Sequence, residues 1–380
     1  MKIGIYTQPL RYNYGGILQA WALQTVLKRM GHEVVTFDPY PYISLSPAKK
    51  PFAYCKRAIM RLIDGKTAIR AEEKFNREHD IKIRHLKPFI DRNVRRMEFR
   101  TVNDIDATHF DVLIAGSDQV WRPKYNRTYG RTIEYAFFSF ASDCDVKRIA
   151  YAASFGSDKW EYTGKQTTRC AALAQRFSAI SVREASAVQL CKEHLGVEAT
   201  HVLDPTLLLQ REDYEQLILN GIPTSQPSGN LLCYVLDDSQ EMNELIKKIA
   251  ETKRLIPFRS NSHVEDKDAP IEKKIQPPVE QWLRDFQESE FVVTDSFHAC
   301  VFAIIFRKPF VVLGNKIRGV SRYESLFDML SLRHHLLLSS QEYNPDKSYR
   351  IDDDVIGRLE KMKDKSWIFL SKSLTSENEV

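Results

Sequence analysis

The chain has 380 residues, of which 43% are hydrophobic and 28% charged, with a net charge of +5, a composition typical of a globular protein with room for two domains. Its longest apolar run, residues 299–306, is too short for a membrane helix, and no early apolar stretch with a cleavage site predicts a signal peptide. The six cysteines lack C-x-x-C spacing, which argues against a zinc site or a disulfide framework and suits the cytoplasm.

Short apolar runs alternate with helix-like segments in the first half of the chain, a pattern typical of parallel sheets with crossover helices. The segments "KIGIYT" and "EVVTFD" predict two strands, joined by an amphipathic helix that stops at Gly31. The segments "FDVLIAGSD", "RIAYAAS" and "AISVRE" predict further strands. We therefore expect residues 1–220 to form a Rossmann-like lobe.

Residues 40–100 form a basic, helix-rich insertion in this lobe, which includes "RNVRRMEFR". One interpretation is a solvated helical surface. The other is attraction to an anionic membrane surface or an anionic lipid-linked substrate, with peripheral contact at the inner face of the cell membrane. Nucleic acid is not expected as a partner, because the chain shows no recognition motif and no aromatic residues interleaved with basic ones.

Residues 221–230 combine glycine, proline and serine and predict a linker, after which the α/β pattern restarts. Residues 231–350 predict a second Rossmann-like lobe. Residues 351–380 predict a helix that packs back across both lobes through Val355, Leu359, Met362 and Ile368. The expected fold class is α/β, with two Rossmann-like lobes facing a cleft.

Polar turns follow many of these predicted strands. Ligands of open parallel sheets bind beyond the carboxyl ends of the strands, so several polar turns together indicate a ligand site. The turns are "RYNYGG", "GSDQVW", Arg183-Glu184, "DPT", "DSFH" and "GNKIRGVSR".

The "DSFH" turn joins a buried strand, residues 291–294, to a helix that is apolar on all sides. Asp295 or Ser296 can cap this helix, and His298 then lies in its first turn, where the helix dipole favours an anion. His298 is thus a candidate general acid beside a bound anion. The alternative is a core histidine bonded to a backbone carbonyl.

Three arginines are candidates for binding that anion. Arg183 follows a predicted strand, and its planar fork matches a phosphate or a carboxylate, although pairing with Glu184 would also explain it. Ser321 and Glu324 predict a capping box, which places Arg322 in a first helical turn, where a cation opposes the dipole unless it meets an anion. Arg318, in the preceding loop, can join it.

Several other turn residues are candidates for binding a sugar. Gly15, which follows Asn13 and Tyr14, permits close approach of the backbone to a ligand, and Asp118 and Asp204 can orient sugar hydroxyls. Trp121 can stack on a sugar ring. Each residue also has a structural alternative: a tight strand-to-helix turn, aspartates favoured in turns, and a tryptophan in the core.

Taken together and in this order, "NYGGILQAWAL", "VLIAGSDQVW", "SVRE", "LDPTLLL", "VVTDSFHACVFAIIFRKPFVVL" and "GVSRYESLFDML" resemble the polysaccharide pyruvyl transferases over residues 1–330. This resemblance implies a two-lobed, GT-B-like fold. It also implies transfer of pyruvate from phosphoenolpyruvate onto a hexose, of galactose type and as a 4,6-ketal. The acceptor would be a bacterial surface glycan, such as capsule or exopolysaccharide, or its lipid-linked precursor.

The resemblance assigns roles to individual residues. The family's Arg-Leu-His stretch falls on Ser296-Phe297-His298, so the histidine is kept and the arginine is replaced by Ser296. Arg318 or Arg322 would supply the missing charge, and Arg183 matches the family's donor-binding arginine. Phosphoenolpyruvate serves as co-substrate, and the scheme needs no cofactor and no metal.

Two other functions remain open at this point. The same architecture suits a GT-B glycosyltransferase that uses a nucleotide sugar. A glycan-binding family member without catalysis is the second alternative, and it is favoured by the serine at position 296.

Overall fold

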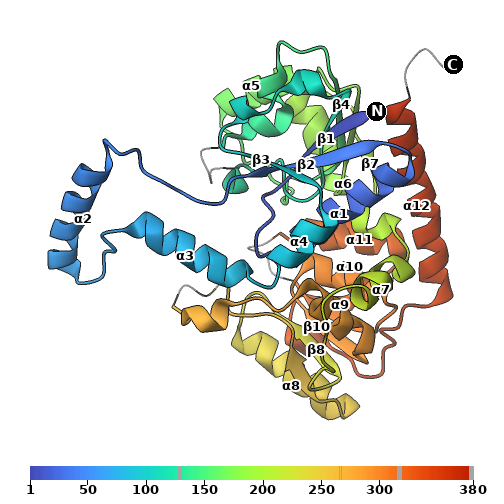
Figure 1. Ribbon diagram of the computed structural model, residues 1–380. Helices are drawn as coiled ribbons and strands as arrows, with labels where there is room; N and C mark the ends of the chain where they lie inside the picture. Colours follow the sequence, from blue (N-terminus) through green and yellow to red (C-terminus); the bar gives the residue numbers. More distant parts are fainter. Residues whose placement is uncertain (127–130, 265, 267, 315–318, 376–380) are drawn as a thin grey trace.

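The computed structural model describes residues 1–126, 131–264, 266, 268–314 and 319–375, and within them two parallel sheets lie one above the other (Figure 1). The N-terminal half of the chain forms the upper lobe, and the C-terminal half forms the lower one. The fold class expected from the sequence, α/β with two Rossmann-like lobes, is confirmed.

The first sheet has seven parallel strands in the order β3-β2-β1-β4-β5-β6-β7. The chain starts in the middle, at β1, builds outward to β3, and returns to the other side through β4. Such a reversal between β1 and β4 leaves a crevice at the carboxyl ends of these strands. The strands are β1 (Lys2–Tyr6), β2 (Glu33–Pro39), β3 (Arg96–Phe99), β4 (Val112–Ala115), β5 (Lys147–Ala153), β6 (Ala179–Val182) and β7 (Thr200–His201).

Helix α1 (Tyr14–Arg29) is the central helix of this lobe and is buried along most of its length. Its first turn is capped by the Asn13 side chain, which accepts a hydrogen bond from the Gly16 amide at 3.3 Å. The remaining helices of the N-terminal half are α2 (Lys50–Asp64), α3 (Ala71–Ile83), α4 (Lys87–Asn93), α5 (Gly164–Ala174), α6 (Ala185–Leu190) and α7 (Arg211–Leu219).

The second sheet has five parallel strands in the order β12-β11-β10-β8-β9, so its chain reversal lies between β8 and β10. At this point the Asp295 carboxylate accepts hydrogen bonds from the amides of Leu236 and Asp237, at 2.7 and 2.8 Å, and ties the two strand ends together. The strands are β8 (Leu231–Tyr234), β9 (Pro257–Arg259), β10 (Phe291–Thr294), β11 (Phe310–Leu313) and β12 (Leu336–Leu337). The helices are α8 (Gln240–Lys253), α9 (Val279–Glu288), α10 (Phe297–Ile305), α11 (Ser321–Leu330) and α12 (Asp353–Leu374).

Helix α12 runs from the lower lobe up along the side of the upper one (Figure 1). Its buried stripe includes Leu359, Ser366 and Leu370, and the Ser366 hydroxyl accepts a hydrogen bond from the Leu203 amide at 3.0 Å. The predicted apolar face was wrong at Ile368, which is 53% exposed. The buried stripe includes residues 359, 363, 366 and 370. The polar residues Lys363 and Ser366 therefore take the buried positions that the sequence suggested for Met362 and Ile368.

The capping box predicted at Ser321 and Glu324 is also wrong. Helix α11 begins at Ser321 itself, with Val320 as its cap and no side-chain capping bond. Glu324 instead pairs with Arg333 at 2.7 Å. Ser296 occupies the N-cap position of helix α10, but its side chain likewise makes no capping hydrogen bond.

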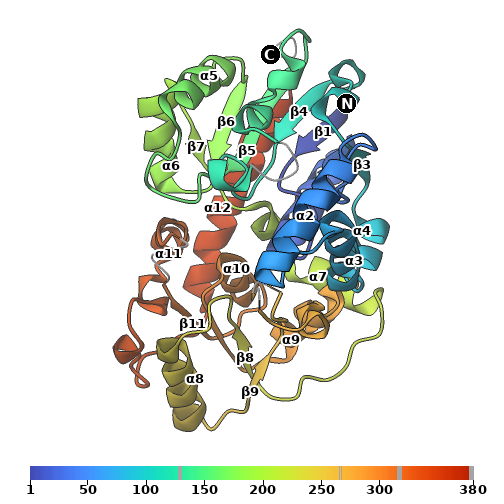
Figure 2. The same cartoon turned by 90° about the vertical axis from the view of Figure 1, so that its left-hand side faces the viewer.

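The basic insertion contributes an arm and a strand. Helices α2 and α3 extend away from the body of the molecule, and Figure 2 shows α2 in front of it. The chain then returns through α4 and adds β3 to the edge of the first sheet, where Arg96 pairs with the buried Asp38 at 3.2 Å. None of the helices, as far as the structure describes them, is long and apolar enough to cross a membrane.

The buried stripe of α12 gives a direct stability test. Leu370 is fully buried, so Leu370→Ala should lower the free energy of unfolding by about 2 to 5 kcal/mol. Ile368→Ala, two residues earlier on the exposed side, should change it by less than about 0.5 kcal/mol. Urea denaturation followed by circular dichroism measures both, and equal effects of the two variants would contradict this placement of α12.

Candidate functional site

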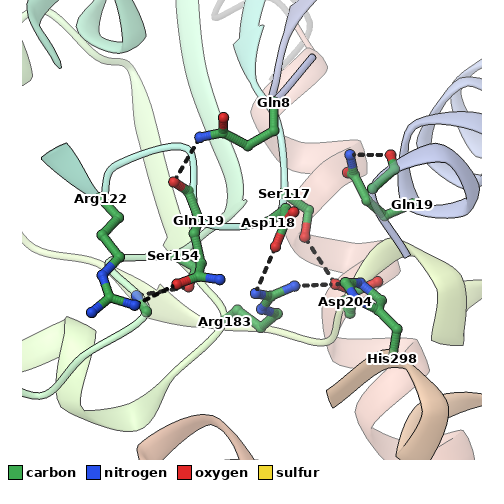
Figure 3. Close-up of polar contacts among 12 residues, drawn as sticks. Gln8, Gln19, Ser117, Asp118, Gln119, Arg122, Ser154, Arg183, Asp204 and His298 are labelled. Atoms are coloured by element: carbon green, nitrogen blue, oxygen red, sulfur yellow. Dashed lines mark hydrogen bonds and ion pairs between the residues drawn. The ribbon is translucent and has the colours of Figure 1, made fainter. Parts of the chain in front are cut away.

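The polar residues that follow four strands meet where the two lobes join (Figure 3). Ser117 and Asp118 follow β4, Arg183 follows β6, and Asp204 lies beyond β7. His298 comes from the other lobe, in the first turn of α10 after β10. The carboxyl ends of the two sheets thus supply one mixed cluster of charged side chains, as expected of a ligand site in parallel sheets.

Asp204 is the centre of this cluster. One carboxylate oxygen, Oδ2, accepts from Arg183 Nη1 at 2.7 Å and from Ser117 Oγ at 3.0 Å. The other, Oδ1, accepts from the amide and the hydroxyl of Thr206 at 3.0 and 2.7 Å. Burial acts to raise the pKa of Asp204, but His298, Arg183 and Thr206 outweigh it and hold that pKa well below its usual value. Asp204 is therefore a fixed negative charge at neutral pH.

Arg183 links the carboxylates that surround it. Its Nη2 donates to Asp118 at 3.3 Å, and its Nε lies 3.8 Å from Glu184. Burial alone would lower the pKa of Arg183, but the charges of Asp204, Asp118 and Glu184 raise it. Arg183 Nε is buried and has no hydrogen-bond partner among the described residues. One donor of a buried guanidinium thus remains available, which in a native site calls for a ligand or a water.

Asp118 is held in an uncommon backbone conformation, with φ at 67°. Left-handed φ is sparsely populated by non-glycine residues, although aspartate tolerates it better than most, and such conformations concentrate at functional sites. The Ser154 amide donates to the Asp118 carbonyl at 3.1 Å and fixes this turn against the end of β5. The turn directs the Asp118 carboxylate toward Arg183.

His298 approaches this cluster from the lower lobe. Its Nε2 lies 3.6 Å from Asp204 Oδ2, which is close enough for an ion pair and too far for a hydrogen bond. His298 is only 6% exposed, and its Nε2 has no hydrogen-bond partner within the described part of the chain. At Nε2, therefore, the alternative of a core histidine bonded to a backbone carbonyl does not hold.

Gly15 gives the His298 ring its space. A Cβ atom at Gly15 would lie 2.0 Å from His298 Nδ1, well inside van der Waals contact. Gly15 was predicted to let the backbone approach a ligand closely. In the structure, the group that lies against Gly15 is the imidazole of His298, from the opposite lobe. A Cβ atom at the adjacent Gly16 would lie 3.7 Å from its nearest neighbour, the Asn13 side chain, which is an ordinary van der Waals distance.

A second guanidinium lies close to the first. The Cζ atoms of Arg183 and Arg322 lie 4.6 and 5.7 Å from the centroid of the Phe297 ring. Burial raises the pKa of Glu184, while Arg183, Ser154 and Arg322 act to lower it. Arg322 thus belongs to the same electrostatic cluster as Arg183 and His298, although 139 positions separate the two arginines in the sequence.

The other predicted site residues lie at varying distances from this cluster. Tyr14 is buried, stacks on Trp282 and donates to the Pro277 carbonyl at 2.7 Å, so it joins the lobes. Trp121 is fully buried, stacks on Phe137 and donates to the Ala136 carbonyl at 3.2 Å, which leaves no ring face for a sugar. Arg318 lies outside the described residues.

Comparison with known proteins places the chain in a family. A model of the polysaccharide pyruvyl transferase family matches residues 13–317, most of the chain. The chain belongs to this family. The protein is accordingly a transferase, and the resemblance read from the sequence motifs is confirmed. Comparison with curated protein sequences finds no match.

Two solved structures are similar to this pyruvyl transferase family member at low sequence identity. UDP-GlcNAc 2-epimerase from Methanocaldococcus jannaschii is 12% identical, with a TM-score of 0.43 over 96% of this chain and 93% of that one. Arabidopsis thaliana UGT89C1 in complex with UDP-L-rhamnose is 11% identical, with a TM-score of 0.48 over 98% of this chain and 97% of that one. At these scores the likeness carries no conclusion about substrate.

Three polar partners in the cluster were not predicted from the sequence: Ser117, Thr206 and Ser154. Glu184, which was predicted as a pairing partner of Arg183, lies 3.8 Å from its Nε. Ser117 and Thr206 stood next to predicted aspartates, in "GSD" and "DPT", so their position beyond strands was a usable signal. Among the described residues, no group of three or more histidine, cysteine, aspartate or glutamate side chains is arranged to hold a metal ion.

Gly15 and Gly16 form a matched pair for testing the His298 contact. Gly15→Ala should force the imidazole away from Asp204, so we expect lower thermal stability and a large loss of any activity that depends on His298. Gly16→Ala, one residue later, should be neutral or stabilise the transferase by about 0.4 to 1 kcal/mol, because alanine restricts the unfolded chain. Differential scanning fluorimetry ranks the variants; equal tolerance at both positions would contradict the close contact.

The charge of Asp204 predicts a pH dependence. The folded-state pKa is depressed, so Asp204 stabilises the fold above its unfolded pKa of about 3.9, and this contribution is lost as pH falls below that value. Asp204→Asn should lower the free energy of unfolding at neutral pH by about 3 to 5 kcal/mol, because it breaks a buried pair, and should flatten the acid limb. Asp143→Asn, at an exposed position of the same lobe, is the control. Unfolding curves of the parent and of both variants at several pH values test this prediction.

Proposed function

We propose that the protein transfers pyruvate from phosphoenolpyruvate onto a hexose of a surface polysaccharide or its lipid-linked precursor, with formation of a 4,6-ketal. The observation that carries this proposal is the meeting of His298 and Arg322 from one lobe with Arg183 from the other around Phe297 and Asp204. Family membership supports the reaction class.

The donor matches the charges and donors of the cluster. Phosphoenolpyruvate carries about three negative charges near neutral pH, from its carboxylate and its phosphate. Asp204 and Asp118 occupy two nitrogens of Arg183 and hold the guanidinium in place, which leaves Nε as a donor. His298 Nε2 is the second available group, and both lie in the first turns after strand ends. Arg322, in the first turn of α11, supplies the cation that Ser296 does not.

The chemistry then follows from a proton donor beside a bound anion. One sugar hydroxyl adds to C2 of the donor while His298 delivers a proton to C3, which becomes the methyl group. The proton of this first hydroxyl replaces the one that His298 gave up. A second hydroxyl then attacks C2, its proton leaves with the departing group as inorganic phosphate, and the ketal closes. Asp204, a fixed negative charge, lies 3.6 Å from the Nε2 atom of His298.

Access to the site requires movement of the lobes. Arg183, His298 and Arg322 are 3%, 6% and 7% exposed, so the donor reaches them only when the junction opens. Closure afterwards excludes water from a carbon centre that would otherwise be hydrolysed. The hydrogen bonds that join the lobes near α1, from Tyr14 to Pro277 and from Gln276 to Tyr12, are the contacts about which such a motion can occur.

The acceptor and the cellular setting are further parts of the proposal. We assign the acceptor to a growing bacterial glycan, for capsule or exopolysaccharide, assembled on a lipid carrier in the cytoplasm at the inner membrane surface. Asp118 and Gly15, which contact Arg183 and His298, are with Asn13 the proposed acceptor-binding residues; Tyr14, buried between the lobes, is not. The basic arm supports the peripheral contact with the membrane.

His298→Ala tests the assignment. The parent protein, incubated with phosphoenolpyruvate and a panel of galactosides, should release phosphate and add to one acceptor the mass of pyruvate less water. His298→Ala should lower kcat by about 10² to 10⁴-fold, the usual contribution of a general acid. His109→Ala, at an exposed position of the upper lobe, is the control and should keep full activity.

Thermal shift separates this function from its main competitor. Phosphoenolpyruvate should raise the Tm of the parent, and UDP- or GDP-sugars should not. Stabilisation by a nucleotide sugar alone, or the absence of a pyruvate ketal across the whole panel, would overturn the proposal.

A further inference from the structure

Helix α2 packs against little of the rest of the described chain. It stands at the end of the arm, away from both lobes in Figure 1, and lies in front of the body of the molecule in Figure 2. None of its fifteen residues, all of which the structure describes, is buried. Its main anchor is Arg57, whose guanidinium pairs with Glu72 of α3 through two bonds of 2.7 and 2.8 Å.

One side of α2 is apolar and faces outward. Phe52, Ile59, Leu62 and Ile63 are 78%, 61%, 87% and 82% exposed, and Cys55 between them is exposed as well. Their spacing, at positions 52, 55, 59, 62 and 63, places them on one stripe of an α-helix. Apolar side chains grouped on an exposed helix mark an interaction surface, whereas scattered ones do not.

The surroundings of this stripe are strongly basic. Residues 49–66 contain six lysines and arginines and a single acidic residue, Asp64. Lys50 and Arg61 point to the side opposite the stripe in the helical repeat, and Lys56 lies at its margin. An apolar stripe with a basic polar side is the pattern of helices that lie in the surface of an anionic bilayer.

We propose that α2 binds the surface of an anionic lipid bilayer, with Phe52, Ile59, Leu62 and Ile63 in the acyl boundary and the flanking lysines and arginines on the lipid headgroups. A second copy of this chain is a poorer occupant, because two such helices would bring like charges together. The basic side chains and the convex, unpaired stripe both match a planar anionic surface.

The root of the arm connects this surface to the site. Tyr42 donates to Asp80 of α3 at 2.6 Å, and the Gln276 amide of the lower lobe donates to the Lys82 carbonyl at 3.3 Å. Helix α3, of thirteen residues, is about 20 Å long and separates α2 from the lobe junction. If the proposed function holds, membrane-bound α2 therefore keeps the junction within reach of a glycan that extends from its lipid anchor.

Vesicle sedimentation tests the proposal without any catalytic step. The full-length parent should co-sediment with vesicles of phosphatidylcholine and phosphatidylglycerol, and much less with phosphatidylcholine alone. The double variant Ile59→Asp with Leu62→Asp should weaken this partition by on the order of a hundredfold, since two apolar side chains are lost from the interface. Lys50→Glu with Lys56→Glu should weaken it, and added salt should weaken the parent's binding.

The matched control is the double variant Leu219→Asp with Ile256→Asp. These residues are 73% and 62% exposed, on α7 and before β9, and neither lies in the arm. This variant should bind the anionic vesicles as the parent does. Ile59, Leu62, Leu219 and Ile256 are all exposed, so neither of the two aspartate double variants should lose stability. Scanning fluorimetry measures the stability of both.

Cys55 offers a second readout on the stripe itself. It is the one exposed cysteine of the six, so an environment-sensitive fluorophore attached there should shift its emission to the blue on anionic vesicles. The same fluorophore at Leu219→Cys, in a Cys55→Ser background, should not shift.

Failure of the parent to bind anionic vesicles at low salt would overturn the proposal. So would a parent dimer, seen by light scattering, that Ile59→Asp with Leu62→Asp converts to monomer, since a second copy would then cover the stripe. Transfer of pyruvate to a soluble galactoside should be unchanged in the α2 variants, so this result separates failure here from failure of the proposed function.

Discussion

The buried pair between Arg183 and Asp204 is the interaction on which the rest of the site depends. Asp204 anchors the guanidinium at 2.7 Å, and the two polar neighbours Ser117 and Thr206 hold the carboxylate itself. A buried charge is costly unless it is paired and fully hydrogen-bonded. Asp204 meets this condition, whereas the Nε of Arg183 has no hydrogen-bond partner among the described residues. A ligand bound beside His298 could accept a hydrogen bond from this nitrogen.

The two lobes contribute different things to this arrangement. The upper lobe supplies a network that is complete without its partner, made of strand ends β4, β6 and β7. The lower lobe supplies the imidazole and the second guanidinium, both in the first turns of helices α10 and α11, where the helix dipoles add positive potential. In the proposed function, this preformed charge in the upper lobe and the imidazole of the lower lobe would couple closure of the lobes to assembly of the site.

Most strands and helices could be predicted from the sequence, because apolar runs followed by polar turns are a local signal. Strand β3 was missed, since it lies within the segment predicted to be a helix-rich insertion. The site residues His298, Arg183 and Asp204 were found in the same way, as polar residues just beyond such runs. What could not be predicted was which neighbour each would meet. Gly15 gave no local sign that its missing Cβ makes room for a histidine almost three hundred positions away, and Ile368 followed the apolar spacing yet lies at the surface. These outcomes depend on packing between segments that are distant in the chain.

The way the chain returns from the arm, through α4 into strand β3, has a practical consequence. Strand β3 completes the edge of the first sheet, and its Arg96 shares Asp38, which is fully buried, with Arg11. Excision of the whole insertion would therefore strip a sheet edge and leave an interior carboxylate with half of its countercharge. A shortened chain that keeps β3 and joins the segment before α2 to the segment after α3 would remove the projecting helices while the Rossmann sheet stays intact. The arm and the sheet, although contiguous in sequence, are separable modules for protein engineering.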